Sequence, residues 1–239
     1  MKIVISQPMY FPWVGMFEQV NLCDAYVNYD DVQFSKGSFT NRVQIKTNSS
    51  RGFNWLTVPL KNLKLGVLIN ELEIDNQRDW QNQHLELLKQ SYKNAPYLKE
   101  MLDLVTNLFD CHLHTIAEVS IKSIELSIDY FDIAKDKSFY TASKLGIEGS
   151  NSERVYQIVK YLNGTHYITG HGAKNYLDHS LFENNGIRVE YMNYLKLPYP
   201  QQFATFNPHV SILDLIANIG KQGKEYIKSS TIYWEEFLA

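Results

Sequence analysis

The sequence predicts an α/β protein with a mostly parallel sheet, a Rossmann-like opening of the kind found in nucleotidyltransferases, and a helical middle segment. Three observations carry this prediction. Residues 2–29 follow a strand–helix–strand pattern, which favours two parallel strands joined by a right-handed crossover. Apolar residues at helical spacing dominate residues 80–133. Short apolar runs that are typical of strands then follow, up to about residue 192.

The first strand is expected at Lys2–Ser6, where three branched apolar residues stand in a row. Pro8 and Pro12 cannot contribute to a regular ladder, so residues 7–13 are expected to form a loop. The remaining expected strands are Ala25–Tyr29, Val43–Lys46, Trp55–Leu60, Phe139–Ala142, Tyr167–Thr169 and Val189–Met192. The expected helices are Val14–Leu22, Trp80–Tyr92, Pro96–Phe109, Thr115–Phe131, Ser152–Leu162 and Ile212–Ile219. The last of these helices begins after an N-cap at Ser211 and ends before Gly220.

The composition limits the classes of function. A length of 239 residues fits one continuous domain, and the sequence has neither an internal repeat nor a low-complexity linker. The net charge of −3 argues against broad nucleic-acid binding, which needs a basic face. Cys23 and Cys111 are too few for a disulfide framework, and both are expected to be small buried hydrophobes. No apolar run is long enough to span a bilayer, so we expect a cytoplasmic protein.

The loop at residues 7–15 is the first candidate for ligand binding. It follows the first strand and precedes a helix, the place where α/β sheets usually bind ligands. Exposed N–H groups at the start of a helix favour an anion such as phosphate or carboxylate. Gln7, Tyr10 and Trp13 are therefore candidate substrate-binding residues. A proline-shaped connection that packs its aromatic side chains inward is the alternative.

Polar residues after the second strand form another candidate group. Asp30 and Asp31 are adjacent, so only one of them can face a given cleft, where it could act as a base. Arg42 is suited to gripping a phosphate or carboxylate with two hydrogen bonds, and Asn41 could position a substrate. The alternative is a solvated turn that holds a surface ion pair.

Among the histidines, His171 stands out because it lies between Gly170 and Gly172 directly after an expected strand. Glycine lets the backbone approach a ligand closely, so this turn could hold a general base or a phosphate contact. A turn histidine without a role is the alternative. His84 is expected on the polar side of its helix. No His-x-x-x-His or His-Glu-x-x-His spacing occurs, so the sequence predicts no zinc site.

A last polar group lies towards the C-terminal end, at Tyr199, Gln201, Asp214 and Asn218. Asp214 and Asn218 are four residues apart and therefore share one face of the last expected helix. These four residues are candidate substrate contacts. Ser211 and Asp214 also have the spacing of a helix-capping pair, which is the structural alternative.

Together these segments resemble the WbqC-like family, and the resemblance covers nearly the whole chain. It rests on Gln7-Pro8-x-Tyr10-Phe11-Pro12-Trp13-x-Gly15, Asp30-Asp31, Asn41-Arg42, Trp55–Pro59, Tyr92, Ala95–Tyr97, Tyr167–Gly170, Tyr199, Gln201 and Ser211–Gly220. The resemblance implies a place in O-antigen or related surface-polysaccharide synthesis, with glycine (aminoacyl) transfer as the proposed activity. The opening also resembles adenylyl- and cytidylyltransferases of the HIGH-motif type. Those enzymes use two histidines in this loop, and residues 10–15 contain none, which puts their phosphate chemistry in doubt here.

We therefore expect a transferase that attaches an aminoacyl or acyl group to the amine of a nucleotide-linked amino sugar. His171, Asp30 or Asp31 would act as the base, Arg42 as the phosphate clamp, and the opening loop, Arg42 and His171 would share one pocket. The donor is left open among ATP-driven chemistry, an acyl-carrier-protein thioester and a coenzyme A thioester. The oligomeric state is also left open, with a homo-oligomer as one possibility. The alternatives are a nucleotidyltransferase that binds ATP or CTP and a non-catalytic scaffold of the polysaccharide assembly machinery.

Overall fold

The structure is a computed structural model that describes residues 1–203 and 205–239. Its strands are β1 (Lys2–Ser6), β2 (Ala25–Asn28), β3 (Arg42–Lys46), β4 (Phe53–Thr57), β5 (Ser138–Thr141), β6 (His166–Thr169), β7 (Arg188–Tyr194) and β8 (Ser229–Tyr233). Its α-helices are α1 (Val14–Leu22), α2 (Trp80–Ser91), α3 (Leu98–Phe109), α4 (Ile116–Phe131), α5 (Asn151–Tyr161), α6 (His179–Glu183), α7 (Ile212–Ile219) and α8 (Trp234–Leu238). Short 3-10 helices lie at Ile69–Glu71, Ala142–Lys144, His171–Asn175 and Gly220–Tyr226.

Six strands form one sheet in the order β5-β2-β1-β6-β7-β8, and β3 and β4 form a separate antiparallel pair. The pairs within β5-β2-β1-β6-β7 are all parallel, whereas β8 is antiparallel to β7. The predicted mixed α/β fold with a mostly parallel sheet is therefore confirmed. The chain leaves β1 towards β2 on one side and later returns to β6 on the other side. The gap between β1 and β6 is thus the topological switch point, where ligands of open α/β sheets bind.

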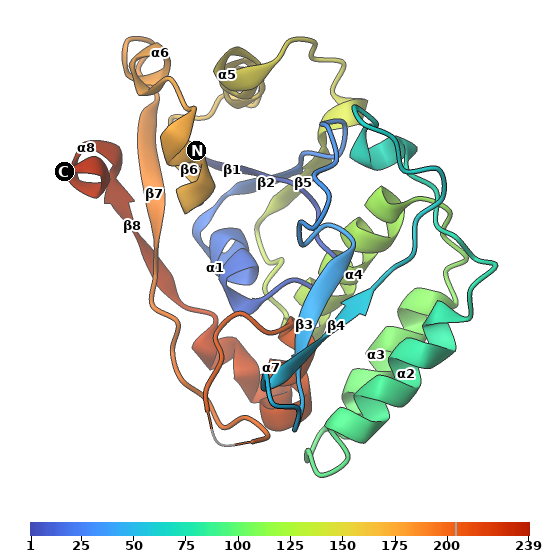
Figure 1. The fold of residues 1–239 in the computed structure, drawn as a ribbon. Helices are drawn as coiled ribbons and strands as arrows, with labels where there is room; N and C mark the ends of the chain where they lie inside the picture. Colours follow the sequence, from blue (N-terminus) through green and yellow to red (C-terminus); the bar gives the residue numbers. More distant parts are fainter. Residues whose placement is uncertain (204) are drawn as a thin grey trace.

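Helices cover both faces of the sheet, and the alternation of side chains along each strand explains how (Figure 1). On β1, Val4 faces a core shared with α1, α3, α4 and α7. Ile3 and Ile5 face the opposite core, which they share with α5 and α6. Because both faces are covered, most residues of the central strands are buried and apolar, as buried parallel strands require. The β3–β4 pair and the α2–α3 helices extend the first core.

Most expected elements lie within one or two residues of their predicted positions, but several expectations were wrong. β4 spans Phe53–Thr57 rather than Trp55–Leu60, because pairing with β3 fixes Phe53 opposite Lys46. Val189–Met192 is not the last strand, since the more polar segment Ser229–Tyr233 pairs with β7 as β8. α6 and α8 were also missed, because each has only five residues and little periodicity.

Two individual side chains also differ from expectation. His84 is buried rather than solvent-facing, because its Nδ1 is hydrogen-bonded to the hydroxyl of Tyr10 at 3.1 Å. Cys23 is buried as expected, whereas Cys111 is exposed just after α3. Within residues 1–203 and 205–239, no helix combines the length and the apolar content that crossing a membrane requires.

Candidate functional site

A cleft of about 490 Å³ opens at the carboxyl edge of the sheet, at the switch point between β1 and β6. We call it the switch-point cleft. Its lining includes Gln7, Trp13, Gly170, His171, Tyr194 and Lys196. The loop after β1, the turn after β6 and the segment after β7 thus meet here, although they are far apart in the sequence. The fold places this cleft where sheets of this topology bind small molecules.

The opening loop contributes to the cleft and to the core at the same time. Gln7, Met9 and Trp13 line the cleft, whereas Tyr10 and Phe11 are fully buried. Tyr10 therefore does not face the cleft, because its hydroxyl is occupied by His84 beneath the loop. The loop therefore packs two of its aromatic side chains inward, as the structural alternative predicted, while Gln7 and Trp13 line the cleft.

Aromatic rings form one wall of the cleft. The Trp13 ring centroid lies 4.9 Å from that of Tyr194 and 5.2 Å from that of His209. The hydroxyl of Tyr194 accepts a hydrogen bond from Gln19 Nε2 at 2.8 Å, which fixes that ring. The Trp13 ring lies so close to the backbone of Gly15 that a Cβ there would meet it at 2.1 Å. Glycine at position 15 is thus required for the position of the indole.

His171 lines the cleft beside Tyr194, with 5.1 Å between the ring centroids. Its Nε2 lies 2.6 Å from the carbonyl oxygen of Met192. A carbonyl can only accept a hydrogen bond, so Nε2 carries the hydrogen and Nδ1 of the neutral ring keeps its lone pair. His171 is therefore held in the tautomer that a general base needs. Gly170, before it, would bring a Cβ within 3.3 Å of the Tyr194 hydroxyl.

The electrostatics of the cleft favour an anion. Among the described residues that line it, Lys196 carries the one permanent charge, and no carboxylate is present. Burial lowers the pKa of His209, and the nearby positive charge of Lys196 lowers it further. His209 is thus kept neutral as an aromatic wall residue. Sequence reasoning missed Lys196, Tyr194 and His209, because nothing in their local sequence distinguishes them from ordinary loop and strand residues.

Asp30 and Asp31 do not line the switch-point cleft. Asp30 is buried, and its carboxylate accepts hydrogen bonds from the backbone N–H and the hydroxyl of Ser143, at 3.0 and 2.7 Å. Asp31 forms an ion pair with Arg154 at 2.5 Å. Both residues lie just beyond the end of β2 at Asn28: Asp30 ties this segment to the 3-10 helix Ala142–Lys144, and Asp31 ties it to α5.

Arg42 and Asn41 also lie outside the cleft lining. The guanidinium of Arg42 donates to the carbonyl of Gly37 at 2.5 Å and stacks over Trp55 at 4.2 Å. Asn41 Nδ2 donates to the carbonyl of Val58 at 2.9 Å. The expectation that Arg42 shares a pocket with His171 was wrong, because β3 belongs to the separate hairpin and not to the main sheet.

The last predicted group holds a long loop against α7. Asp214 is fully buried, and its Oδ2 accepts a hydrogen bond from the Tyr92 hydroxyl at 2.9 Å. Burial raises the pKa of Asp214 to about 6. Gln201 makes two hydrogen bonds to the backbone of Asn207, and Asn218 accepts one from Gln202. Buried Tyr199 completes this group, which lies outside the cleft lining and supports the segment that carries Lys196.

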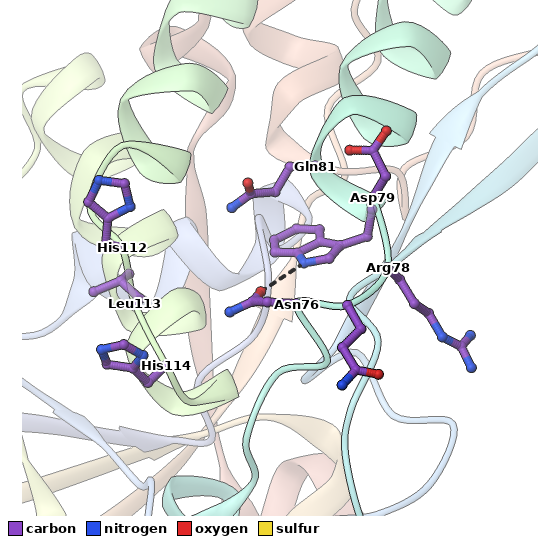
Figure 2. Close-up of a pocket in the computed structure, with 9 residues that line it drawn as sticks. Asn76, Arg78, Asp79, Gln81, His112, Leu113 and His114 are labelled. Atoms are coloured by element: carbon purple, nitrogen blue, oxygen red, sulfur yellow. Dashed lines mark hydrogen bonds between the residues drawn. The ribbon is translucent and has the colours of Figure 1, made fainter.

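A second hollow of about 460 Å³ lies between the start of α2 and the loop before α4. Figure 2 shows His112 and His114 on that loop, across from Asn76 and Gln81. Trp80 also lines the hollow, and its indole N–H donates to Asn76 at 3.3 Å. The histidines are exposed, and nowhere in the described parts of the chain do three His, Cys, Asp or Glu side chains form a group that could hold a metal ion. We assign no role to this hollow.

A mostly parallel sheet with an aromatic, cationic cleft at its switch point defines a Rossmann-like α/β protein. The sequence profile of the WbqC-like protein family matches residues 7–226. The chain belongs to this family, as the sequence motifs indicated. It is also similar to the uncharacterized protein Rv1507c of Mycobacterium tuberculosis (strain ATCC 25618 / H37Rv), with 29% identity over 230 residues that cover 95% of this chain and 97% of the relative. No solved structure matches it.

Proposed function

We propose that this protein is a transferase that attaches an aminoacyl group of the glycyl type, or another acyl group, to the amine of a nucleotide-linked amino sugar in surface-polysaccharide synthesis. One observation carries the proposal: a single cleft combines an oriented base, a cation and an aromatic wall. His171 would take a proton from the attacking amine, and Lys196 would hold the phosphates. Trp13 and Tyr194 would stack on the sugar or the base.

The polysaccharide context comes from the resemblance stated above and is part of the proposal. The donor is an acyl-carrier-protein thioester, a coenzyme A thioester or an adenylate formed with ATP. Each of these donors presents an acyl carbon that a neutral amine can attack. Gly172, directly after His171, has no heavy atom within 4 Å of the place where a Cβ would lie, which leaves room for a donor to approach His171.

Mass spectrometry of the acceptor tests the proposal directly. The purified protein is incubated with UDP- and dTDP-linked amino sugars and each donor in turn. We expect the mass of the acceptor to increase by one acyl group, and we expect His171→Asn to slow the transfer by about 10²-fold or more. His166→Asn, at the start of β6 and outside the cleft lining, is the matched control and keeps wild-type activity. A product that forms equally fast with His171→Asn would contradict the assigned base, and no product with any donor would contradict the transferase.

Nucleotidyl transfer is the alternative that the strand order favours, because this topology binds nucleotides in many enzymes. It predicts release of pyrophosphate when the protein is mixed with ATP or CTP, magnesium and a sugar phosphate. The same mixture without sugar phosphate is the control. Pyrophosphate release that depends on the sugar phosphate would replace the acyl-transfer proposal.

A further inference from the structure

Glu18 lies in α1, directly behind the wall of the switch-point cleft. The residue is 1% exposed, and neither carboxylate oxygen has a hydrogen-bond partner among the described residues. The Ser229 hydroxyl beside it donates its one hydrogen to the carbonyl of Asn193, at 2.6 Å. A buried carboxylate without partners is unfavourable for folding. Such groups gather at functional sites, and the packing of α1 gives no structural reason for this one.

Glu18 lines a small chamber next to the cleft. The chamber has a volume of about 10 Å³, which is about the space that one water molecule needs. Trp13 and Lys196 line both the chamber and the switch-point cleft. These two side chains therefore separate Glu18 from a ligand in the cleft, and of the two only Lys196 can carry a proton.

The titratable groups around Glu18 identify Lys196 as its charged neighbour. Burial raises the pKa of Glu18 to about 7, and the positive charge of Lys196 opposes this rise. Tyr194 on β7 also acts on Glu18, but burial raises the pKa of Tyr194 to about 12, so it stays neutral. On β8 the facing group is the Ser229 hydroxyl, which does not titrate. A carboxyl that changes charge near neutral pH thus lies behind the one lysine of the cleft.

We propose that Glu18 is the final proton acceptor of the cleft: it receives, through Lys196, the proton that the acceptor amine must lose before it can attack. This inference rests on the proposed transferase function and adds a positioning residue to it. Glu18 does not touch the substrate, because Trp13 and Lys196 lie between them.

The protons of the transfer then balance. The acceptor enters as an ammonium ion, and its nitrogen loses two protons before the amide product is complete. Lys196 takes one proton from the ammonium as it gives one of its own to a water molecule in the chamber, and this water passes a proton to Glu18. The lysine therefore stays charged and the glutamate becomes neutral. The amine attacks the acyl carbon, the C–N bond forms, and the bond to the leaving group breaks. Nδ1 of His171 takes the second proton and passes it to the leaving group.

The dependence of the transfer rate on pH tests this proton path. Two acceptors must be unprotonated in the wild-type protein, so the acid limb of log kcat against pH approaches a slope of about two. We expect Glu18→Gln to reduce this slope to about one and to lower kcat by about 10²-fold, with unchanged KM. Glu18→Asp should restore part of the rate, and the exposed Glu86→Gln on α2 is the matched control. An unchanged slope in Glu18→Gln would overturn the proposal.

A second measurement needs no donor. In protein labelled with ¹³C at the glutamate side-chain carboxyls, NMR follows the titration of Glu18. We expect a midpoint near pH 7 that Lys196→Met shifts upward, since the lysine charge lowers the pKa of Glu18. A midpoint that Lys196→Met leaves unchanged would refute the Glu18–Lys196 pair, whatever the activity. If Glu18→Gln transfers the acyl group with the pH profile of the wild type, only the role of Glu18 is refuted. If Lys196→Met shifts the titration of Glu18 but no donor gives an acylated product, only the proposed function is refuted.

Discussion

Replacing Gly15 by alanine should disturb ligand binding while leaving the fold intact. A Cβ at this position would lie 2.1 Å from Cη2 of Trp13 and 2.3 Å from its Cζ3. Carbon atoms pack at about 3.5 Å, so the edge of the indole must retreat by about 1.4 Å from its position. Trp13 is the partition between the cleft and Glu18 and contacts both Tyr194 and His209. The substitution therefore moves a wall of the cleft without touching any charged group.

The expected effects on stability and on binding differ in size. Gly15 lies in α1, where alanine is favoured by up to about 1 kcal/mol, and the displaced indole offsets this gain. We therefore expect the free energy of unfolding to change by less than about 1 kcal/mol. Loss of one stacking contact corresponds to about tenfold weaker binding of a UDP-linked amino sugar.

Isothermal titration calorimetry measures the binding, and thermal unfolding measures the stability. The control is Gly15→Ala in a Trp13→Ala background, where the added methyl group has nothing to displace and should cause no further loss. Wild-type affinity in the single Gly15→Ala variant would refute the reasoning. So would an additive loss in the double variant, because the effect would then not pass through the indole.

Two further predictions concern groups that the sequence had placed in the site. Because burial raises the pKa of Asp214 from 3.8 to about 6, the native protein binds more protons than the unfolded chain between these values, and the free energy of unfolding decreases as pH rises through them. Denaturant titrations from pH 4 to pH 7 should show a loss of about 2 kcal/mol that Asp214→Asn removes. Equal slopes in both proteins would contradict this prediction. Arg154→Met should lower the free energy of unfolding by about 2–4 kcal/mol, since it leaves the mostly buried Asp31 without its cation. Lys160 is exposed on the same helix, so Lys160→Met is the control and should change the free energy of unfolding by less than about 0.5 kcal/mol. An equally small loss in Arg154→Met would show that the ion pair does not stabilise the fold.

Local patterns were sufficient to predict most of the strands and most of the helices. Branched apolar residues at Lys2–Ser6 and the two prolines after them define β1 and the loop that follows it. The same patterns failed for β8, whose polar residues find their place only by pairing with β7. His84 shows a related limit, because its helix face is buried by Tyr10 from a loop more than seventy residues away.

The candidate site was predictable only where chemistry and topology coincide. Residues that directly follow a central strand, such as Gln7 and His171, were found because parallel strands end at one edge. Arg42 was misplaced because the sequence does not show that β3 leaves the main sheet. Lys196 and Glu18 gave no local signal. Their importance follows from burial and proximity, which depend on contacts between distant segments.

The central claim is that the switch-point cleft holds an anionic nucleotide-linked ligand against Lys196. Calorimetric titration of UDP-linked amino sugars into the wild type, Lys196→Met and Arg42→Ala tests it most directly. We expect Lys196→Met to weaken binding by about tenfold or more and Arg42→Ala to change it by less than about twofold. Binding that is lost in Arg42→Ala but kept in Lys196→Met would contradict the account and place the ligand at the β3–β4 hairpin.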